Sequence, residues 1–213
     1  MVVCMIAVDE AAGLLGVSER RMRAMLHGGQ IRGEKVAGRW LVAPSSLSMF
    51  RPKTRPMAPG NAMALATLFD GGDIDVHPEV RRRLQRKLDM LRSADDPAVL
   101  VASWLAARGD RKEFWAADST DLRKDPKIRP SGFSDPRSQM SAPGSFEGYV
   151  APADLDDVIV EHWLVAAGSR QPKVFLHIAN VDAIPFLYLI ADLMEHGLGR
   201  DQDQARKCLA ARL

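Results

Sequence analysis

The chain has 213 residues, of which 46% are hydrophobic and 26% are charged, so it can build one medium domain or two small domains with their own cores. No stretch reaches the roughly eighteen apolar residues of a membrane span, and no secretory signal is present, so we expect a cytoplasmic protein without membrane contact. Cys4 and Cys208 lie at opposite ends without a CxxC pair or a nearby His cluster, so neither a zinc site nor a disulfide framework is implied, and free thiols are expected.

Positive charge is concentrated at the start of the chain. The whole sequence has a net charge of +2, but residues 1–59 hold nine Lys or Arg against four Asp or Glu, a net charge of +5. The remaining 154 residues hold twenty against twenty-three, a net charge of −3. This asymmetry indicates a nucleic-acid-binding end followed by a part with a different role.

Residues 8–27 have the pattern of two short helices joined by a tight turn. Asp9 or its neighbour opens the first helix, Gly16 makes the corner, Val17 fills the gap and Ser18 caps the second helix. Four residues form the inner face of the first helix: Ala11, Ala12, Leu14 and Leu15. This arrangement is typical of a helix-turn-helix.

The second helix separates an apolar stripe from a basic face. Helical periodicity places Met22, Met25 and Leu26 on the buried side. The opposite side carries Arg20, Arg21, Arg23 and His27. Guanidinium groups in this position can contact guanine edges and phosphates in a major groove, although a solvated basic face has the same pattern.

A β-hairpin is predicted directly after this helix. Residues 33–36 and 39–42 form its strands, and Ala37-Gly38 makes the turn. As the wing of a winged helix-turn-helix, it would bring Arg32, Lys35 and Arg39 to flanking phosphates. Trp40 and Leu41 are predicted to pack beneath the helices.

The remaining chain is predicted to form a larger α+β domain. Residues 51–60 contain three prolines and three basic residues and form a linker between a winged helix-turn-helix at 1–50 and the second domain at 61–213. Helices are predicted at 61–68, 78–92, 96–108, 119–124, 152–163, 185–196 and 201–213, and strands at 114–117, 146–150 and 173–179. Helix 78–92 carries Val80, Leu84, Leu88 and Leu91 on one apolar stripe, and its basic outer face is interpreted as solvated. The whole is α+β with a small sheet.

Residues that could support chemistry are few. The loop at residues 130–144 contains Asp135 and Arg137, which could serve a reaction, although a local turn with a local ion pair is the favoured interpretation. Asp157 and Glu161 have a spacing that can hold a metal but also suits a helix N-terminus. His162 and His177 have no evident ligand companions, and His177 is interpreted as a polar position on a half-covered strand. We therefore predict no catalytic residues, no cofactor and no metal.

Two parts of the chain resemble known families. Residues 5–50 resemble excisionase-like helix-turn-helix modules, relatives of the MerR-type winged helix, in Val8-Asp9-Glu10-Ala11-Ala12, Leu15-Gly16-Val17-Ser18, Arg20-Arg21-Met22-Arg23 and Gly38-Arg39-Trp40-Leu41. This resemblance implies DNA contacts by Ser18, Arg20, Arg21 and Arg23 on the helix and by Arg39 on the wing.

Residues 95–195 are similar to the partner domain of actinobacterial AbiEi-type antitoxins. The motifs are Val101 to Arg108, Pro130-Ser131-Gly132 with Ser134-Asp135-Pro136-Arg137, Glu147-Gly148-Tyr149-Val150 with Asp154-Leu155-Asp156, and Val174-Phe175-Leu176-His177. The similarity implies a protein that represses its own operon and counteracts a nucleotidyltransferase toxin encoded beside it.

Three classes of function stay open from the sequence. The leading one is an autoregulator that binds double-stranded DNA at its own promoter, as a dimer or cooperatively, and uses its second domain for a protein partner such as a toxin. A recombination directionality factor that bends DNA beside an integrase is the alternative. An enzyme brought to DNA by its N-terminal domain is the third, and its only support is the segment around Asp135 and Arg137.

Overall fold

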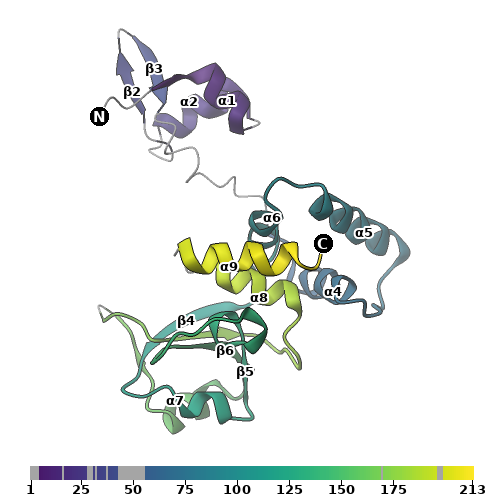
Figure 1. The fold of residues 1–213 in the computed structure, drawn as a ribbon, viewed down its shortest axis with the longest axis vertical. Coiled ribbons are helices and arrows are strands. Elements are labelled where there is room, and N and C mark those ends of the chain that lie inside the picture. The colour runs from purple at the N-terminus through teal and green to yellow at the C-terminus, as the bar shows by residue number, and fades with distance from the viewer. Residues whose placement is uncertain are drawn as a thin grey trace. The chain divides into compact units, whose positions relative to one another are not determined.

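The computed structural model describes residues 5–15, 17–27, 31, 33–36, 38–42, 56–168, 170–195 and 199–213. It is a mixed α+β protein with small sheets (Figure 1). The chain divides into two compact units, Met1–Lys53 and Thr54–Leu213, each with its own hydrophobic core. Among the described residues, no helix combines the length and the apolar character that crossing a bilayer requires.

The first unit packs two helices against a small antiparallel sheet. Its elements are β1 (Ile6–Ala7), α1 (Val8–Leu15), α2 (Glu19–His27), β2 (Gly33–Val36) and β3 (Arg39–Val42), and the strand order is β1-β3-β2. The Ser18 hydroxyl accepts a hydrogen bond from the Arg21 N–H at 3.3 Å, which confirms it as the cap of α2. The predicted corner at Gly16 and the side chains of Leu14 and Leu15 lie outside the described residues.

The core of the first unit is small and forms where its periodicity predicts. The predicted stripe of Met22, Met25 and Leu26 is buried, as are Ala11 and Ala12 of α1. Val8, Ile31 and Val42 complete this core, and Val17 and Trp40 pack against it. A Cβ at Gly33 would lie 2.6 Å from the Leu26 side chain of α2 and would also clash with the Leu41 carbonyl oxygen, so glycine lets α2 lie close to the hairpin.

The second unit contains a group of helices and a five-stranded sheet. The helices are α4 (Pro59–Phe69), α5 (Pro78–Arg92), α6 (Pro97–Trp104), α7 (Leu155–Glu161), α8 (Phe186–Glu195) and α9 (Gly199–Ala210). The strands are β4 (Asp110–Trp115), β5 (Ile128–Pro130), β6 (Phe146–Val150), β7 (Val165–Ala166) and β8 (Val174–Ile178), in the order β5-β6-β8-β4-β7. Among the described residues of this sheet, β6 and β8 pair in parallel and the other strand pairs are antiparallel.

Helices cover both faces of this sheet, with α8 on one side and α7 on the other (Figure 1). The larger core lies on the α8 side and includes residues of α4, α5, α6, α8 and α9. The smaller core lies on the α7 side, where Leu155 and Val158 meet Phe146, Val150 and Leu176 of the central strands. Tyr149 and His177 face α8, because they are paired neighbours on β6 and β8 at positions that alternate with these apolar residues.

Predicted helix starts are confirmed at α5 and α6. Pro78 and Pro97 occupy the first turns, and the Asp96 side chain accepts a hydrogen bond from the Val99 N–H at 3.3 Å. On the predicted α5 stripe, Leu84, Leu88 and Leu91 are buried and Val80 is partly buried.

Several predicted bounds are wrong. The helix expected at residues 96–108 ends at Trp104, and the linker expected at residues 51–60 gives way to α4 at Pro59. The strand expected at residues 114–117 begins at Asp110, and β5 and β7 were not predicted. The short helix expected at residues 119–124 is a 3-10 helix over Asp121–Lys124, and the loop at 130–144 contains two further 3-10 turns, at Gly132–Ser134 and Pro136–Ser138.

Candidate functional site

The basic face of α2 is exposed opposite its buried stripe. Arg20, Arg21 and Arg23 are all exposed, and Ser18, the capping residue, is exposed beside them. Arg23 is engaged locally, since its Nη2 lies 2.6 Å from the Glu19 Oε2. This exposed pair contributes little to stability, so a stronger anionic ligand could displace it.

The hairpin places its basic residues on different faces. Lys35 pairs with Trp40 and Arg39 pairs with the next residue, Val36. Because successive positions of a strand point to opposite faces, the Lys35 and Arg39 side chains lie on opposite faces of the hairpin. Both basic residues are exposed, whereas Arg32 lies outside the described residues. The Trp40 ring is partly buried and meets the His27 ring edge-on, with a centroid distance of 5.3 Å, so it joins β3 to α2.

The most strongly interacting polar residues of the second unit are buried. Arg108, four residues after the end of α6, donates from Nε to the Asp192 Oδ1 at 2.7 Å and to the Tyr149 hydroxyl at 2.8 Å. Its Nη1 donates to the Glu195 Oε1 at 2.8 Å. Asp192 also accepts hydrogen bonds from the Tyr149 hydroxyl, at 3.0 Å, and from the Ser131 hydroxyl.

His177 and Glu147 extend this buried cluster along the sheet. The His177 Nε2 lies 3.0 Å from the Glu147 Oε1 and 3.5 Å from the Asp192 Oδ1, and its ring stacks on Tyr149 at a centroid distance of 4.8 Å. Side-chain exposure is 1% or less for Arg108, Glu147, His177 and Asp192. The interpretation of His177 as a position on a half-covered strand is wrong, because both faces of β8 are covered.

Burial and neighbouring charges together shift the pKa values of the arginine and of the tyrosines in and beside the cluster. Burial opposes the positive charge of Arg108, but Asp192, Tyr149 and Glu195 together raise its pKa well above its ordinary value. Burial also raises the pKa of Tyr149 well above its usual value, and Asp192 adds to this effect. For Tyr188, burial raises the pKa to about 12. The arginine stays charged and the phenols stay neutral hydrogen-bonding groups.

Backbone geometry leaves little room around Glu147. Gly132 has a φ of +51°, and a Cβ there would lie 1.6 Å from the Glu147 Oε2. The Ser134 hydroxyl accepts a hydrogen bond from the Glu147 N–H at 2.9 Å. The cluster is therefore closely packed and shielded from water, so we interpret it as a structural link between α8, the central strands and the end of α6.

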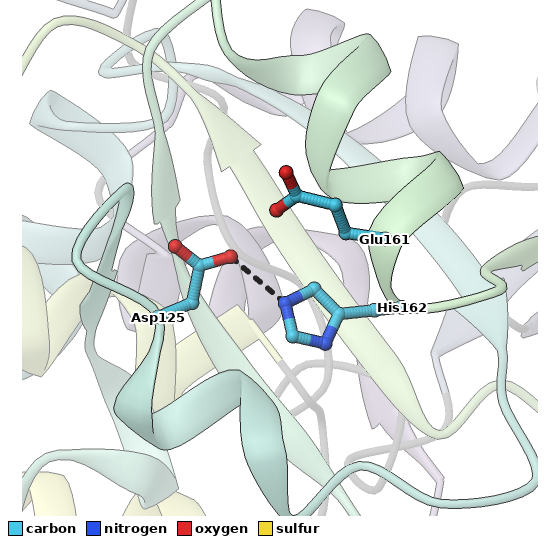
Figure 2. A group of neighbouring side chains, drawn as sticks. All are labelled: Asp125, Glu161 and His162. Carbon is cyan, nitrogen blue, oxygen red and sulfur yellow. Dashed lines mark hydrogen bonds and ion pairs between the residues drawn. The ribbon is translucent and has the colours of Figure 1, made fainter.

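A second polar group lies at the C-terminal end of α7 (Figure 2). The His162 Nε2 is 2.8 Å from the Asp125 Oδ2, and the Glu161 carboxylate lies close to both. His162 and Asp125 side chains are 15% and 6% exposed. Burial raises the pKa of Asp125, but hydrogen bonds from His162 and from the Lys127 N–H outweigh this effect and hold the pKa below its ordinary value.

Oxygen and imidazole donors of this kind suit several divalent metals. Here, however, the Lys127 Nζ lies 2.8 Å from the Glu161 Oε1 and 3.6 Å from the Asp157 Oδ2. An ammonium group thus already balances the carboxylates, and the group fits a role in fixing the end of α7. His162, expected to lack companions, has one in Asp125, and Asp157 and Glu161 contact Lys127.

Asp135 and Arg137 form the local pair predicted for their turn. The Asp135 Oδ1 accepts from the Arg137 N–H at 2.8 Å, and the Arg137 Nη2 lies 2.5 Å from the Asp135 Oδ2. The same guanidinium donates to the Ile184 carbonyl oxygen at 2.9 Å. Hydrogen bonding to Asp135 raises the pKa of Arg137. These contacts join the turn to the segment before α8.

No role in a site was predicted for Arg108, Glu147 or Asp192 from the sequence. Two of them carried a usable signal, since Glu147 interrupts the apolar strand Phe146–Val150 and Asp192 interrupts the apolar helix Phe186–Glu195. A charged residue inside a buried element must be paired, and this rule would have directed attention to both.

Comparison of the chain with protein-family models, with curated proteins and with solved structures found no match.

Proposed function

We propose that this protein is a DNA-binding autoregulator whose first unit is a winged helix-turn-helix. In this proposal α2 enters the major groove and the β2–β3 hairpin contacts the adjacent backbone. The observation that carries the proposal is the exposed row of Arg20, Arg21 and Arg23 on a helix whose other face is anchored by buried methionine and leucine side chains. A rigid helix with outward guanidinium groups is a suitable reader of guanine edges.

The second unit supports a further role beside DNA binding. It has a separate core and spans Thr54–Leu213, far more chain than a DNA-bending factor needs. We propose that it binds a protein partner, most concretely a nucleotidyltransferase-type toxin encoded beside it, which makes the protein an antitoxin that represses its own operon. Two copies, or cooperative binding, would provide the paired half-sites that a single small reading module needs.

Fluorescence anisotropy of the full chain tests DNA binding. The probe is a duplex from immediately upstream of its own gene, compared with a scrambled duplex at two salt concentrations, because phosphate binding alone is strongly salt-dependent. We expect a preference for the upstream duplex that survives the higher salt. No preference would contradict autoregulation and would favour a recombination directionality factor or a DNA-directed enzyme.

Single substitutions separate base reading from backbone contact. Arg20→Ala and Arg23→Ala should weaken binding to the specific duplex by about 1 to 3 kcal/mol, whereas Arg39→Ala should weaken both duplexes about equally. Arg92→Ala is the matched control, since Arg92 forms an exposed helical ion pair with Asp89 at 3.0 Å, as Arg23 does with Glu19. Equal losses on both duplexes for Arg20→Ala and Arg23→Ala would rule out base reading by α2.

A further inference from the structure

Three exposed apolar side chains, those of Val160, Trp163 and Val165, follow closely along the chain at and just after the end of α7. Their exposed fractions are 73%, 85% and 49%, which makes Trp163 the most exposed of the large hydrophobic residues in the described part of the chain. Tryptophan is rarely left in water, and it is enriched among the residues that dominate binding energy at protein interfaces. We name these three residues the Trp163 patch.

The backbone at Trp163 is also unusual. The Leu164 N–H donates to the Ile159 carbonyl oxygen at 2.9 Å and the Trp163 N–H donates to the Val160 carbonyl oxygen at 3.3 Å. These two bonds form the Schellman motif that ends many helices, and Trp163, with a φ of +53°, occupies the left-handed position where glycine is preferred. Neither burial nor backbone conformation favours tryptophan here, so selection for the fold does not explain this residue.

Both neighbours of Trp163 are fixed. His162 is held by Asp125, as Figure 2 shows, and Leu164 is 6% exposed within the smaller core. The indole therefore projects from a backbone that is anchored on each side. An exposed aromatic group on an anchored backbone loses less conformational freedom when a partner covers it than one on a mobile backbone, which favours binding.

Charge around the patch indicates the chemistry of what binds there. Residues 151–163 contain four Asp or Glu and no Lys or Arg. Asp157 and Glu161 contact Lys127, but Asp156 is exposed and lies one helical turn before Val160, on the same side of α7. A patch paired with its own copy would bring the two Asp156 carboxylates together, whereas a basic surface would complement them.

We propose that the Trp163 patch is the docking site for a different protein, whose surface offers an apolar pocket for the indole beside a lysine or arginine for Asp156. This inference rests on the proposed function, in which that protein is the toxin encoded beside this chain. Trp163 is the central contact, and Asp156 selects for a basic partner.

Thermal unfolding tests whether Trp163 serves the fold or a partner. Trp163→Gly should raise the Tm by about 2 to 4 °C, because glycine adopts the left-handed conformation without strain. Gln139→Gly is the matched control, since Gln139 has a φ of 54° and is also exposed. A lower Tm for Trp163→Gly would show that the indole stabilises the fold and would overturn the proposal.

Binding to the purified product of the neighbouring gene tests the partner. Calorimetry with the full chain should show binding that Trp163→Gly weakens by at least about 30-fold and Asp156→Lys weakens less. Gln139→Gly and Met90→Ala, which removes an apolar side chain that is 53% exposed on α5, should bind as the unmodified chain does.

The outcomes separate this inference from the proposed function. If the unmodified chain does not bind the neighbouring product, the antitoxin proposal fails and the docking site fails with it. If the unmodified chain and Trp163→Gly bind equally, the antitoxin proposal stands and the docking site is wrong. Concentration-dependent dimerisation that Trp163→Gly abolishes in sedimentation would assign the patch to a second copy and would also overturn the inference.

Discussion

Arg108 joins three parts of the second unit through one buried side chain. Its guanidinium contacts Asp192 and Glu195 of α8, Tyr149 of β6 and the Leu105 carbonyl oxygen, all from a position with 1% side-chain exposure. A buried ion pair of this kind adds little to stability by comparison with a well-packed apolar pair. Removal of either Arg108 or Asp192, however, leaves the other charge buried in the protein interior without water or an opposite charge to stabilise it.

Arg108→Met should therefore destabilise the second unit by about 3 to 5 kcal/mol, because Asp192 would remain buried without its cation. Urea unfolding followed by circular dichroism measures this difference. Arg92→Met is the control, since Arg92 is 55% exposed and its pair with Asp89 lies on the surface, and its effect should stay within about 0.5 kcal/mol. Similar small effects for both variants would show that water reaches Asp192.

At the scale of single elements, the end of α7 is defined by side chains outside the helix. Asp125 belongs to the segment after the 3-10 turn Asp121–Lys124, and its carboxylate holds both His162 and the backbone N–H of Lys127. Because Asp125 has a folded-state pKa below its ordinary value, the pair stabilises the fold only while Asp125 is ionised.

Asp125→Asn should lower stability most above about pH 4, where the carboxylate is charged in the folded and the unfolded chain. As the pH falls through the lowered folded-state pKa, the Asp125 contribution is lost, and the difference between the two proteins should shrink. Urea unfolding at a series of pH values from neutral to about pH 3 measures this difference. A difference that stays constant throughout would contradict a contribution from ionised Asp125.

Elements with a strong local pattern were predictable from the sequence. The stripes of α2 and α5 and the capping Ser18 and Asp96 are local signals, and each is present in the structure. The first four residues of β4 were not predicted because Asp110 to Glu113 are all charged, and their pairing with β8 depends on backbone groups. β7 was missed because two residues show no periodicity.

The buried cluster was not predictable from local pattern, because its members come from distant parts of the chain. Arg108 and Asp192 are 84 residues apart and meet only after the sheet and α8 have packed. The exposure of Trp163 was not predictable either, because an aromatic residue at a helix end is usually part of a core. In the structure its exposed fraction is 85%.

For the whole molecule, the separate cores predict that the second unit is an autonomous folding unit. A fragment of residues 54–213 contains the complete larger and smaller cores of this unit, the Arg108 cluster and the Trp163 patch. We expect it to fold with the near-ultraviolet circular dichroism and urea midpoint of the corresponding transition in the full chain. Loss of near-ultraviolet signal with retained helicity would show that the first unit is required for its packing.

The Arg108 cluster also restricts how this sequence can diverge over generations. A lineage that changes Arg108 or Asp192 alone gives up about 3 to 5 kcal/mol of a total stability of about 5 to 15 kcal/mol, so most such single steps are eliminated. Descendants should therefore inherit Arg108, Glu147, His177 and Asp192 together or replace them together. Gly132, confined by the Glu147 carboxylate, would become free of that contact only after Glu147 had been replaced by a smaller residue.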